Sequence, residues 1–182
     1  MKSTQAKLFP LKTTQSYGGI LRNKAQNRGA RPLTNKGSLH LVLRSSLAKG
    51  AWSFRHPKIS QKLTSFIQTF SKKKGVQILS LANVGNNLHL HLKITNRTLY
   101  KAWIRGLTSA IPMMILGRKG LEELKDKNKK FWDYRPFTRI VSSLSAFLKL
   151  KDYIEINQLE GSGVPRMQAE VMIHQKRTSL AE

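Results

Sequence analysis

The clearest periodic pattern of the chain lies near its middle, in the run Val84-Gly85-Asn86-Asn87-Leu88-His89-Leu90-His91-Leu92-Lys93-Ile94. After the turn-forming Gly85-Asn86, polar and apolar residues alternate without a break. This period of two predicts a half-buried β-strand over residues 87–94. Its leucines and Ile94 would point into a core, and its polar residues would point to the opposite face of the sheet.

The polar face of this strand carries one amide and two imidazoles, from Asn87, His89 and His91. Side chains two residues apart lie on one face of a strand, so these three groups can converge on one metal ion or one phosphate. The alternative is an edge strand whose outer face simply holds polar residues, since histidine is also an ordinary surface residue. The stretch alone leaves both interpretations open.

The charge of the chain indicates a polyanionic partner, most often nucleic acid. The 182 residues include 33 Lys and Arg but only nine Asp and Glu, which gives a formal net charge of +24. The first acidic residue is Glu122, and 22 of the basic residues precede it. A basic protein of the ribosomal type would have the same balance, so the charge indicates the class of partner only. The absence of cysteine excludes disulfides, thiolate zinc sites and cysteine nucleophiles.

The length predicts one domain with tails. Residues 1–30 are basic and polar and predict a flexible arm, residues 31–161 the folded domain, and residues 162–182 a loop-like C-terminal tail. No secretory signal is visible. The longest apolar run, Ala110–Leu116, is too short to span a membrane, so we expect a cytoplasmic protein without a membrane partner.

The predicted elements follow the order β-α-β-β-α-β-α. Strands are expected over residues 38–45, 76–82 and 87–94 and at the end of 131–141, with helices over 58–74, 97–110 (or as far as 116) and 144–159. Residues 121–130 are expected to be a charged connector. The first six elements are those of a ferredoxin-like split βαβ fold. The predicted class is therefore α+β, a four-stranded antiparallel sheet with an extra C-terminal helix.

Four segments, in order, carry a resemblance to a known family. They are Leu39–Arg44 on the first strand, Gly85–Leu90 against an Asn-His-x-His-Leu strand, Phe131–Phe137 against a Phe-Trp-x-x-Arg block, and Asp152–Gly161 on the last helix. Together they resemble the single-tyrosine HUH transposases, especially the REP-associated branch, over about residues 31–161. The two-histidine motif alone is weak, but the four motifs in this order are fairly specific.

The resemblance implies a mechanism and its residues. Tyr153 would be the nucleophile, attacking a phosphodiester of single-stranded or hairpin DNA to leave a 5′-phosphotyrosine and a free 3′-OH. A divalent ion, Mg or Mn, would be bound by His89, by Asn157 and by Asn87 or His91. Tyr153 and Asn157 are four residues apart, so they share one helix face. Without the resemblance, both would be read as ordinary packing or helix-end residues.

One position departs from the family. In the family the Asn of the motif is followed directly by His-x-His, whereas here Asn86 is followed by Asn87-Leu88-His89. In the first register, Asn87 replaces the first histidine ligand. In the second, His89 and His91 restore two histidines but move the motif along the strand by ~7 Å. We favour the first register because the preceding turn fixes the position of the strand.

Further candidates are contacts to nucleic acid. Phosphate contacts are expected from the basic residues Arg44, Lys72, Lys73, Lys74, Arg135 and Arg139. Trp103 and Trp132 could stack on bases, although packing in the core is the more common role of tryptophan. His40 would lie beside the central strand, either near the site or as a satisfied sheet residue, and His56 and His174 look incidental.

Two functions stay open from the sequence. One is a metal-dependent transposase that nicks and rejoins DNA in transposition. The other is a domesticated module that binds a DNA or RNA hairpin without cutting it, and Asn87 is the residue that separates them. A two-metal nuclease is excluded, because it needs clustered carboxylates that the central strands lack. The family includes monomers and homodimers, so the oligomeric state is open, as is the target sequence.

Overall fold

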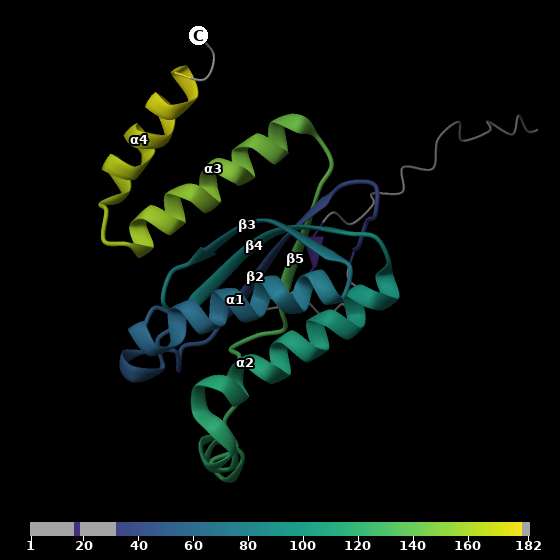
Figure 1. The fold of residues 1–182 in the computed structure, drawn as a ribbon, viewed down its shortest axis with the longest axis vertical. Helices are drawn as coiled ribbons and strands as arrows, with labels where there is room; N and C mark the ends of the chain where they lie inside the picture. Colours follow the sequence, from purple (N-terminus) through teal and green to yellow (C-terminus); the bar gives the residue numbers. More distant parts are fainter. Residues whose placement is uncertain (1–16, 19–31, 180–182) are drawn as a thin grey trace, which may run out of the picture.

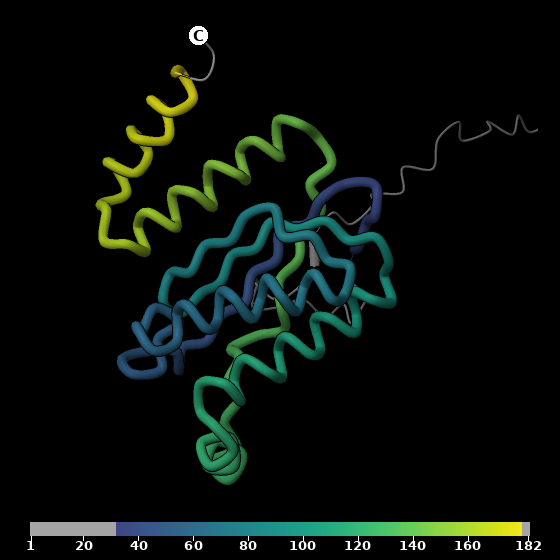
Figure 2. The backbone as a smooth tube through the Cα atoms, in the orientation of Figure 1, coloured from purple at the N-terminus to yellow at the C-terminus, as the bar shows by residue number. Residues whose placement is uncertain are grey.

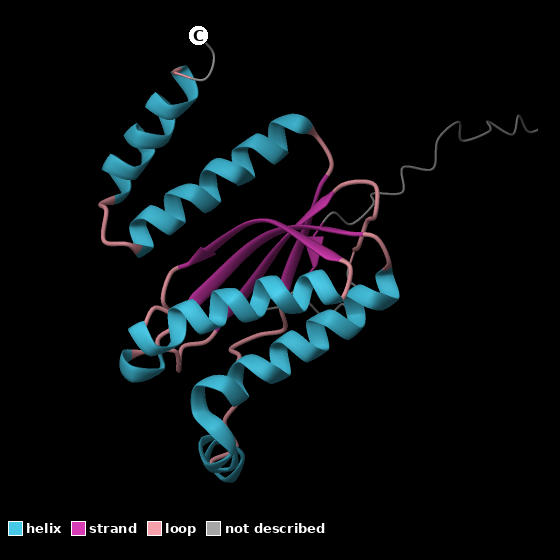
Figure 3. Ribbon diagram, viewed as in Figure 1, coloured by secondary structure: helices cyan, strands magenta, loops and turns pink. Residues whose placement is uncertain are grey.

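A computed structural model describes residues 17–18 and 32–179 of the chain. Within them the protein has three layers, a central sheet with α1 (Pro57–Lys73) and α2 (Arg97–Asp126) on one face and α3 (Leu144–Gly161) on the other (Figures 1 and 3). A fourth helix, α4 (Arg166–Thr178), lies outside α3. A short 3₁₀ helix, η1 (Gly50–Trp52), precedes α1.

The four predicted strands are present and antiparallel: β2 (Ser38–Arg44), β3 (Val76–Asn83), β4 (Asn87–Ile94) and β5 (Phe137–Val141). The sheet order is β1-β5-β2-β4-β3, so β4 lies between β2 and β3. The additional strand, β1 (Tyr17–Gly18), pairs with β5 at the edge. It falls within the predicted flexible arm, and the rest of that arm lies outside the described residues.

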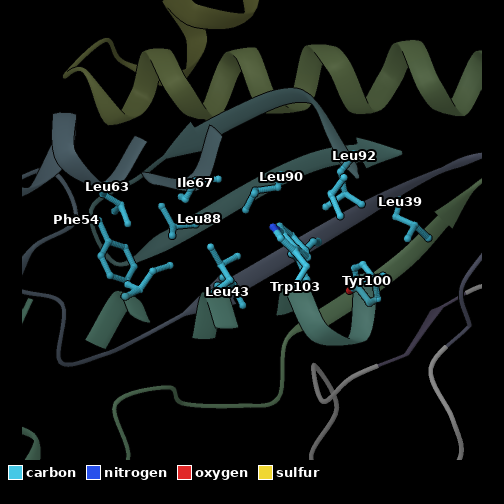
Figure 4. Packing of buried hydrophobic residues seen from close by; sticks show 14 of the residues in the cluster. Leu39, Leu43, Phe54, Leu63, Ile67, Leu88, Leu90, Leu92, Tyr100 and Trp103 are labelled. Carbon is cyan, nitrogen blue, oxygen red and sulfur yellow. The ribbon is translucent and has the colours of Figure 1, made fainter. Parts of the chain in front are cut away.

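The core lies between the sheet and the α1–α2 layer, as the alternation in β4 predicts. Leu88, Leu90 and Leu92 are fully buried there, facing the helices (Figure 4). Trp103 of α2 is also fully buried, and its indole N–H donates to the Ser71 hydroxyl at 3.0 Å. The second prediction for Trp103, packing, is thus the correct one, because no base can reach a side chain enclosed on all sides.

The helices begin at polar caps. The side chain of Asn96 accepts hydrogen bonds from the first turn of α2, and that of Ser143 accepts one from the first turn of α3, as the sequence predicted. His56 is not incidental, because its Nδ1 accepts from the Lys58 backbone N–H at 3.3 Å and caps α1. Local capping therefore fixes where each of these helices starts.

Helix α2 runs further than predicted. The backbone breaks at Gly117, with φ 66° and ψ −176°, and helix then resumes to Asp126, so much of the expected connector over 121–130 is helical. Pro112 lies inside α2 and has no N–H to donate to the carbonyl of Thr108. The indole N–H of Trp132 donates to that carbonyl instead, at 2.8 Å. Trp132 thus satisfies the carbonyl that Pro112 leaves without a donor. Its ring packs on Phe54 and Phe131, so packing rather than base stacking is its role.

The C-terminal segment was predicted to be a loop-like tail, and this prediction is wrong for residues 166–178, which form α4. Helix α4 packs on α3, and ion pairs join the two: Arg177 to Asp152, Lys176 to Glu155 and Arg166 to Glu160. The backbone trace reverses between the helices at residues 162–165 (Figure 2). Every acidic side chain of α3 is therefore paired with a basic side chain of α4.

Among the described residues, no helix is both long enough and apolar enough to cross a membrane.

Candidate active site

The polar face of the sheet lies opposite the core, beneath α3. Antiparallel pairing places His40 of β2 between His91 of β4 and Arg139 of β5, and it places His89 opposite Val42. Directly paired residues share a face. The prediction that His89 and His91 point away from the leucine core is therefore confirmed, and His40 and Arg139 join them on that face.

Tyr153 of α3 reaches the histidines from above. Its ring centroid is 5.5 Å from that of His89 and 5.9 Å from that of His40, and both contacts are edge-on. The Tyr153 side chain stays 37% exposed, so solvent and a ligand can still reach it. The residue that the resemblance implies as nucleophile thus lies against the residue it implies as metal ligand.

The two histidines of β4 have different neighbours. The ring of His89 stacks on His40, with Nδ1 of His89 3.4 Å from Nε2 of His40. The ring of His91 packs on Phe147, and its Nε2 lies 2.7 Å from the Ser38 hydroxyl. His89 therefore faces the tyrosine, whereas His91 is engaged further along the strand.

All three histidines are held in their neutral form at neutral pH. Burial lowers the pKa of His89 from 6.5 to about 4, and burial with nearby Lys93 lowers the pKa of His91 to about 4. Burial, followed by the charges of His89, His91 and Arg139, lowers the pKa of His40 to about 3. A neutral imidazole keeps a nitrogen lone pair, so the pKa shifts favour ligand roles over acid roles.

The amides lie one step further along both elements. Following α3, Phe147 contacts His91, Tyr153 contacts His89, and the Gln158 side-chain oxygen accepts from the backbone N–H of Asn83. Helix α3 therefore runs antiparallel to β4, and Asn157 comes to the level where β4 begins, at Asn87. Asn157 is 8% exposed and lies on the sheet-facing side of α3 with Leu150 and Ile154.

The oxygens of these amides are suited to a hard cation. Asn87 Oδ1 is buried and has no hydrogen-bond partner among the described residues. Asn157 uses its amide nitrogen to donate to the Tyr153 carbonyl at 2.6 Å, which leaves its oxygen for another partner. Oxygen ligands with one imidazole are a donor set that Mg²⁺ or Mn²⁺ accepts. The residues present thus fit such an ion, although within the described part of the chain no three His, Asp or Glu side chains form a metal-binding group.

The basic residues predicted to contact phosphate lie on opposite sides of the sheet. Arg139 lies on the histidine face, beside His40, and Arg135 is exposed just before β5. Arg44 is paired across the sheet with Asn87, and its guanidinium is 3.3 Å from the Asp133 carboxylate. The run 72–74 ends α1, in the layer on the opposite face of the sheet (Figure 1), so the fold does not bring these lysines to Tyr153.

His40 is the site residue that sequence reasoning valued least. A lone histidine on a leucine-rich strand has no local signal of function, and only the pairing of β2 with β4 and β5 brings it to Tyr153. Its position opposite the His-x-His segment in a predicted β2–β4 pair was the one available clue.

Comparisons with known proteins agree at the level of the fold. The chain matches no protein-family model and no curated protein sequence. Among solved structures it is similar to a REP-associated tyrosine transposase bound to a REP hairpin, with 12% identity and a TM-score of 0.51 over 74% of this chain and 73% of that one. It is also similar to a candidate transposase of Deinococcus radiodurans R1, with 16% identity and a TM-score of 0.45 over 72% of this chain and 98% of that one. The likeness to the REP-associated tyrosine transposase shows that the chain has the fold that the sequence resemblance implied.

Proposed function

We propose that this protein is a single-tyrosine transposase of the HUH type, which cuts and rejoins single-stranded or hairpin DNA through Tyr153. One observation carries the proposal: Tyr153 contacts the rings of His89 and His40 while the amides of Asn87 and Asn157 lie one step further along β4 and α3. A packing role alone would not explain why a buried face of a sheet collects histidines and amides beneath a half-exposed tyrosine. The net charge of +24 supports DNA as the partner.

In the proposed reaction, the Tyr153 oxygen loses its proton and bonds to the phosphorus of a phosphodiester. The bond from phosphorus to the 3′ oxygen breaks, and that oxygen takes up a proton to leave a free 3′-OH. The DNA is then joined to Tyr153 through its 5′ phosphate. Attack by a 3′-OH on this intermediate releases the tyrosine, which makes joining the reverse of cutting.

His89, Asn87 and Asn157 would hold the divalent ion, Mg or Mn. When bound, the ion supplies charge that polarises the scissile phosphate. The hydrogen bond between His40 and His89 orients the His89 ring, as outer partners of metal-bound histidines generally do. The helix α3 presents Tyr153 and Asn157 together, since they are one turn apart.

The proposal uses the first register of the motif, in which Asn87 and not His91 is a ligand. The antiparallel course of α3 over β4 places Asn157 toward the end of β4 that carries Asn87, whereas His91 packs on Phe147 and lies 2.7 Å from the Ser38 hydroxyl. A ligand set of His89, Asn87 and Asn157 therefore leaves His91 to its contacts with Phe147 and Ser38. In this arrangement Asn87 takes the place that the family gives to a histidine.

That departure also supports a second candidate, a DNA or RNA hairpin-binding module that has lost cleavage. The proposed ligand set of one imidazole and two amides is neutral and contains no carboxylate, so it would hold a divalent ion too weakly for catalysis. The fold and the basic surface would serve binding equally well.

Covalent capture of DNA separates the two candidates. An end-labelled hairpin with unpaired flanks is incubated with Mg²⁺ or Mn²⁺, and protein–DNA adducts are separated under denaturing conditions. The transposase predicts an adduct for the wild type and none for Tyr153→Phe, with hairpin affinity nearly unchanged because only one hydroxyl is removed. Tyr134→Phe, in the exposed loop before β5, is the matched control and should form the adduct. No adduct from the wild type, together with tight hairpin binding, would favour the binding module.

A further inference from the structure

A pocket of about 600 Å³ opens directly beside Tyr153. Among the described residues, α3 packs mainly on β3 and β4, and the pocket lies between its side chains and those of β2 and β5. Tyr153, Lys149 and Ser145 line it from α3, and His40, Phe137 and Arg139 line it from the sheet. A pocket of this size is in the range of small-molecule and nucleotide sites.

The polar lining of this pocket is positive. Arg139 and Lys149 both contribute to it, and no acidic residue does. Among the described residues, neither of these cations takes part in an ion pair, whereas the basic residues of α4 are matched with the acids of α3. Asp152 and Glu155, the acids nearest to Tyr153 in sequence, form ion pairs with α4 and do not line the pocket. A phosphate in the pocket would therefore meet two unneutralised cations and no carboxylate.

The apolar lining is aromatic. The rings of His40 and Phe137 meet edge to face with centroids 6.5 Å apart, and the ring of Tyr153 stands edge-on to His40 at 5.9 Å. Flat rings set at angles make a wall against which a flat base can stack, and stacking of this kind needs no particular base. The pocket thus combines the two features by which proteins hold unpaired nucleotides, a cationic groove and aromatic surface.

We propose that this pocket binds the unpaired nucleotide adjacent to the scissile phosphate, with its phosphate on Arg139 and Lys149 and its base against Phe137 and His40. The proposal rests on the proposed function, because it places the pocket beside the nucleophile. It gives a role to Lys149, which no sequence motif indicates. It also distinguishes Arg139, which lines the pocket, from the other predicted phosphate contacts, which do not. Arg139 and Lys149 act as positioning residues, fixing where along the strand Tyr153 attacks.

Coupling between one phosphate and one lysine tests the proposal. All proteins carry Tyr153→Phe, so that binding is measured without cleavage. A set of hairpins, each with a neutral methylphosphonate at one position of the unpaired flank, is bound to proteins with and without Lys149→Gln or Arg139→Gln. Lys151→Gln is the matched control, because Lys151 is exposed on the same helix and does not line the pocket.

The expected result is one flank position at which the methylphosphonate weakens binding about 3- to 10-fold with Lys149 present and has little further effect in Lys149→Gln. Arg139→Gln should couple to the same position, and Lys151→Gln to none. A base analogue, 2-aminopurine, placed at that position should lose fluorescence on binding as it stacks.

Two failures are distinguishable. If hairpins bind but no position couples to Lys149 or Arg139 more strongly than to Lys151, the pocket proposal is overturned and the proposed function stands. If no hairpin binds to the protein even without the pocket substitutions, the proposed function fails, and the pocket proposal fails with it.

Discussion

Replacing Asn87 by histidine is the change most informative about the site. Asn87 begins β4, and its side-chain oxygen is buried without a hydrogen-bond partner among the described residues. Asn87→His therefore removes no hydrogen bond of that oxygen, and it relieves a buried polar atom that costs about 1–3 kcal/mol when left unsatisfied. We expect the fold to tolerate the substitution and the divalent ion to bind more tightly, by about tenfold on the scale of changes around metal sites.

The size of the effect follows from linkage between binding and unfolding. At an Mn²⁺ concentration equal to the wild-type Kd, bound ion stabilises the wild type by about 0.4 kcal/mol, and a tenfold tighter site gains about 1.4 kcal/mol. For a domain of this length, 1 kcal/mol moves Tm by about 2–4 °C. Mn²⁺ should therefore raise Tm by about 1 °C in the wild type and by about 3–6 °C in Asn87→His.

Thermal unfolding with and without Mn²⁺ measures this difference directly. Asn86→His is the matched control, because it adds the same side chain one residue earlier, in the turn before β4. His91→Ala should leave the Mn²⁺ shift unchanged if Asn87, His89 and Asn157 are the ligands. The reasoning would be refuted if Asn87→His gave no larger shift than Asn86→His, and the second register would be supported if His91→Ala abolished the shift.

Three further predictions test the fold and the partner. Urea unfolding should show a lower free energy of unfolding at about pH 5 than at about pH 7.5. Below about pH 6.5 the unfolded chain protonates His89 and His91, whereas the folded chain does not protonate them until about pH 4. Equal stability at the two pH values would contradict the buried neutral histidines. Gly106→Ala should destabilise the protein by up to about 2 kcal/mol in chemical denaturation. Its Cβ would lie 2.6 Å from Cζ of Phe70, and displacing that ring costs about 1–3 kcal/mol, of which the better helix propensity of alanine returns about 1 kcal/mol. Ser109→Ala on the exposed side of α2 should not destabilise the protein. Hairpin affinity should fall steeply with salt, with a log–log slope of about −0.7 for each single-strand phosphate neutralised, and an affinity independent of salt would count against the basic surface.

The parts of the fold that the sequence predicted correctly are those with a local signal. Strand β4 follows from strict alternation, and α2 and α3 begin where Asn96 and Ser143 cap them. The pairing of Tyr153 with Asn157 follows from helical spacing. Each of these features depends on residues close together in the sequence, so the local sequence is enough to predict it.

The parts that were missed depend on contacts between distant residues. Helix α4 has a polar sequence, and its ion pairs with Asp152, Glu155 and Glu160 exist only once α3 has formed. The role of Trp132 depends on the carbonyl that Pro112 leaves unpaired, in an element formed much earlier in the chain. The sequence left two roles open for His40, and only the order of the strands places it in the site.

The most direct test of the central claim is the position of the covalent bond. After incubation with labelled hairpin and Mn²⁺, the protein is digested with trypsin and a nuclease, and the modified peptide is identified by mass spectrometry. Cleavage after Lys151 and Arg166 yields a peptide, residues 152–166, in which Tyr153 is the only tyrosine. The account predicts a nucleotide remnant on this peptide, localised to Tyr153. A remnant on the peptide containing Tyr134 or on that containing Tyr100, with residues 152–166 unmodified, would contradict it.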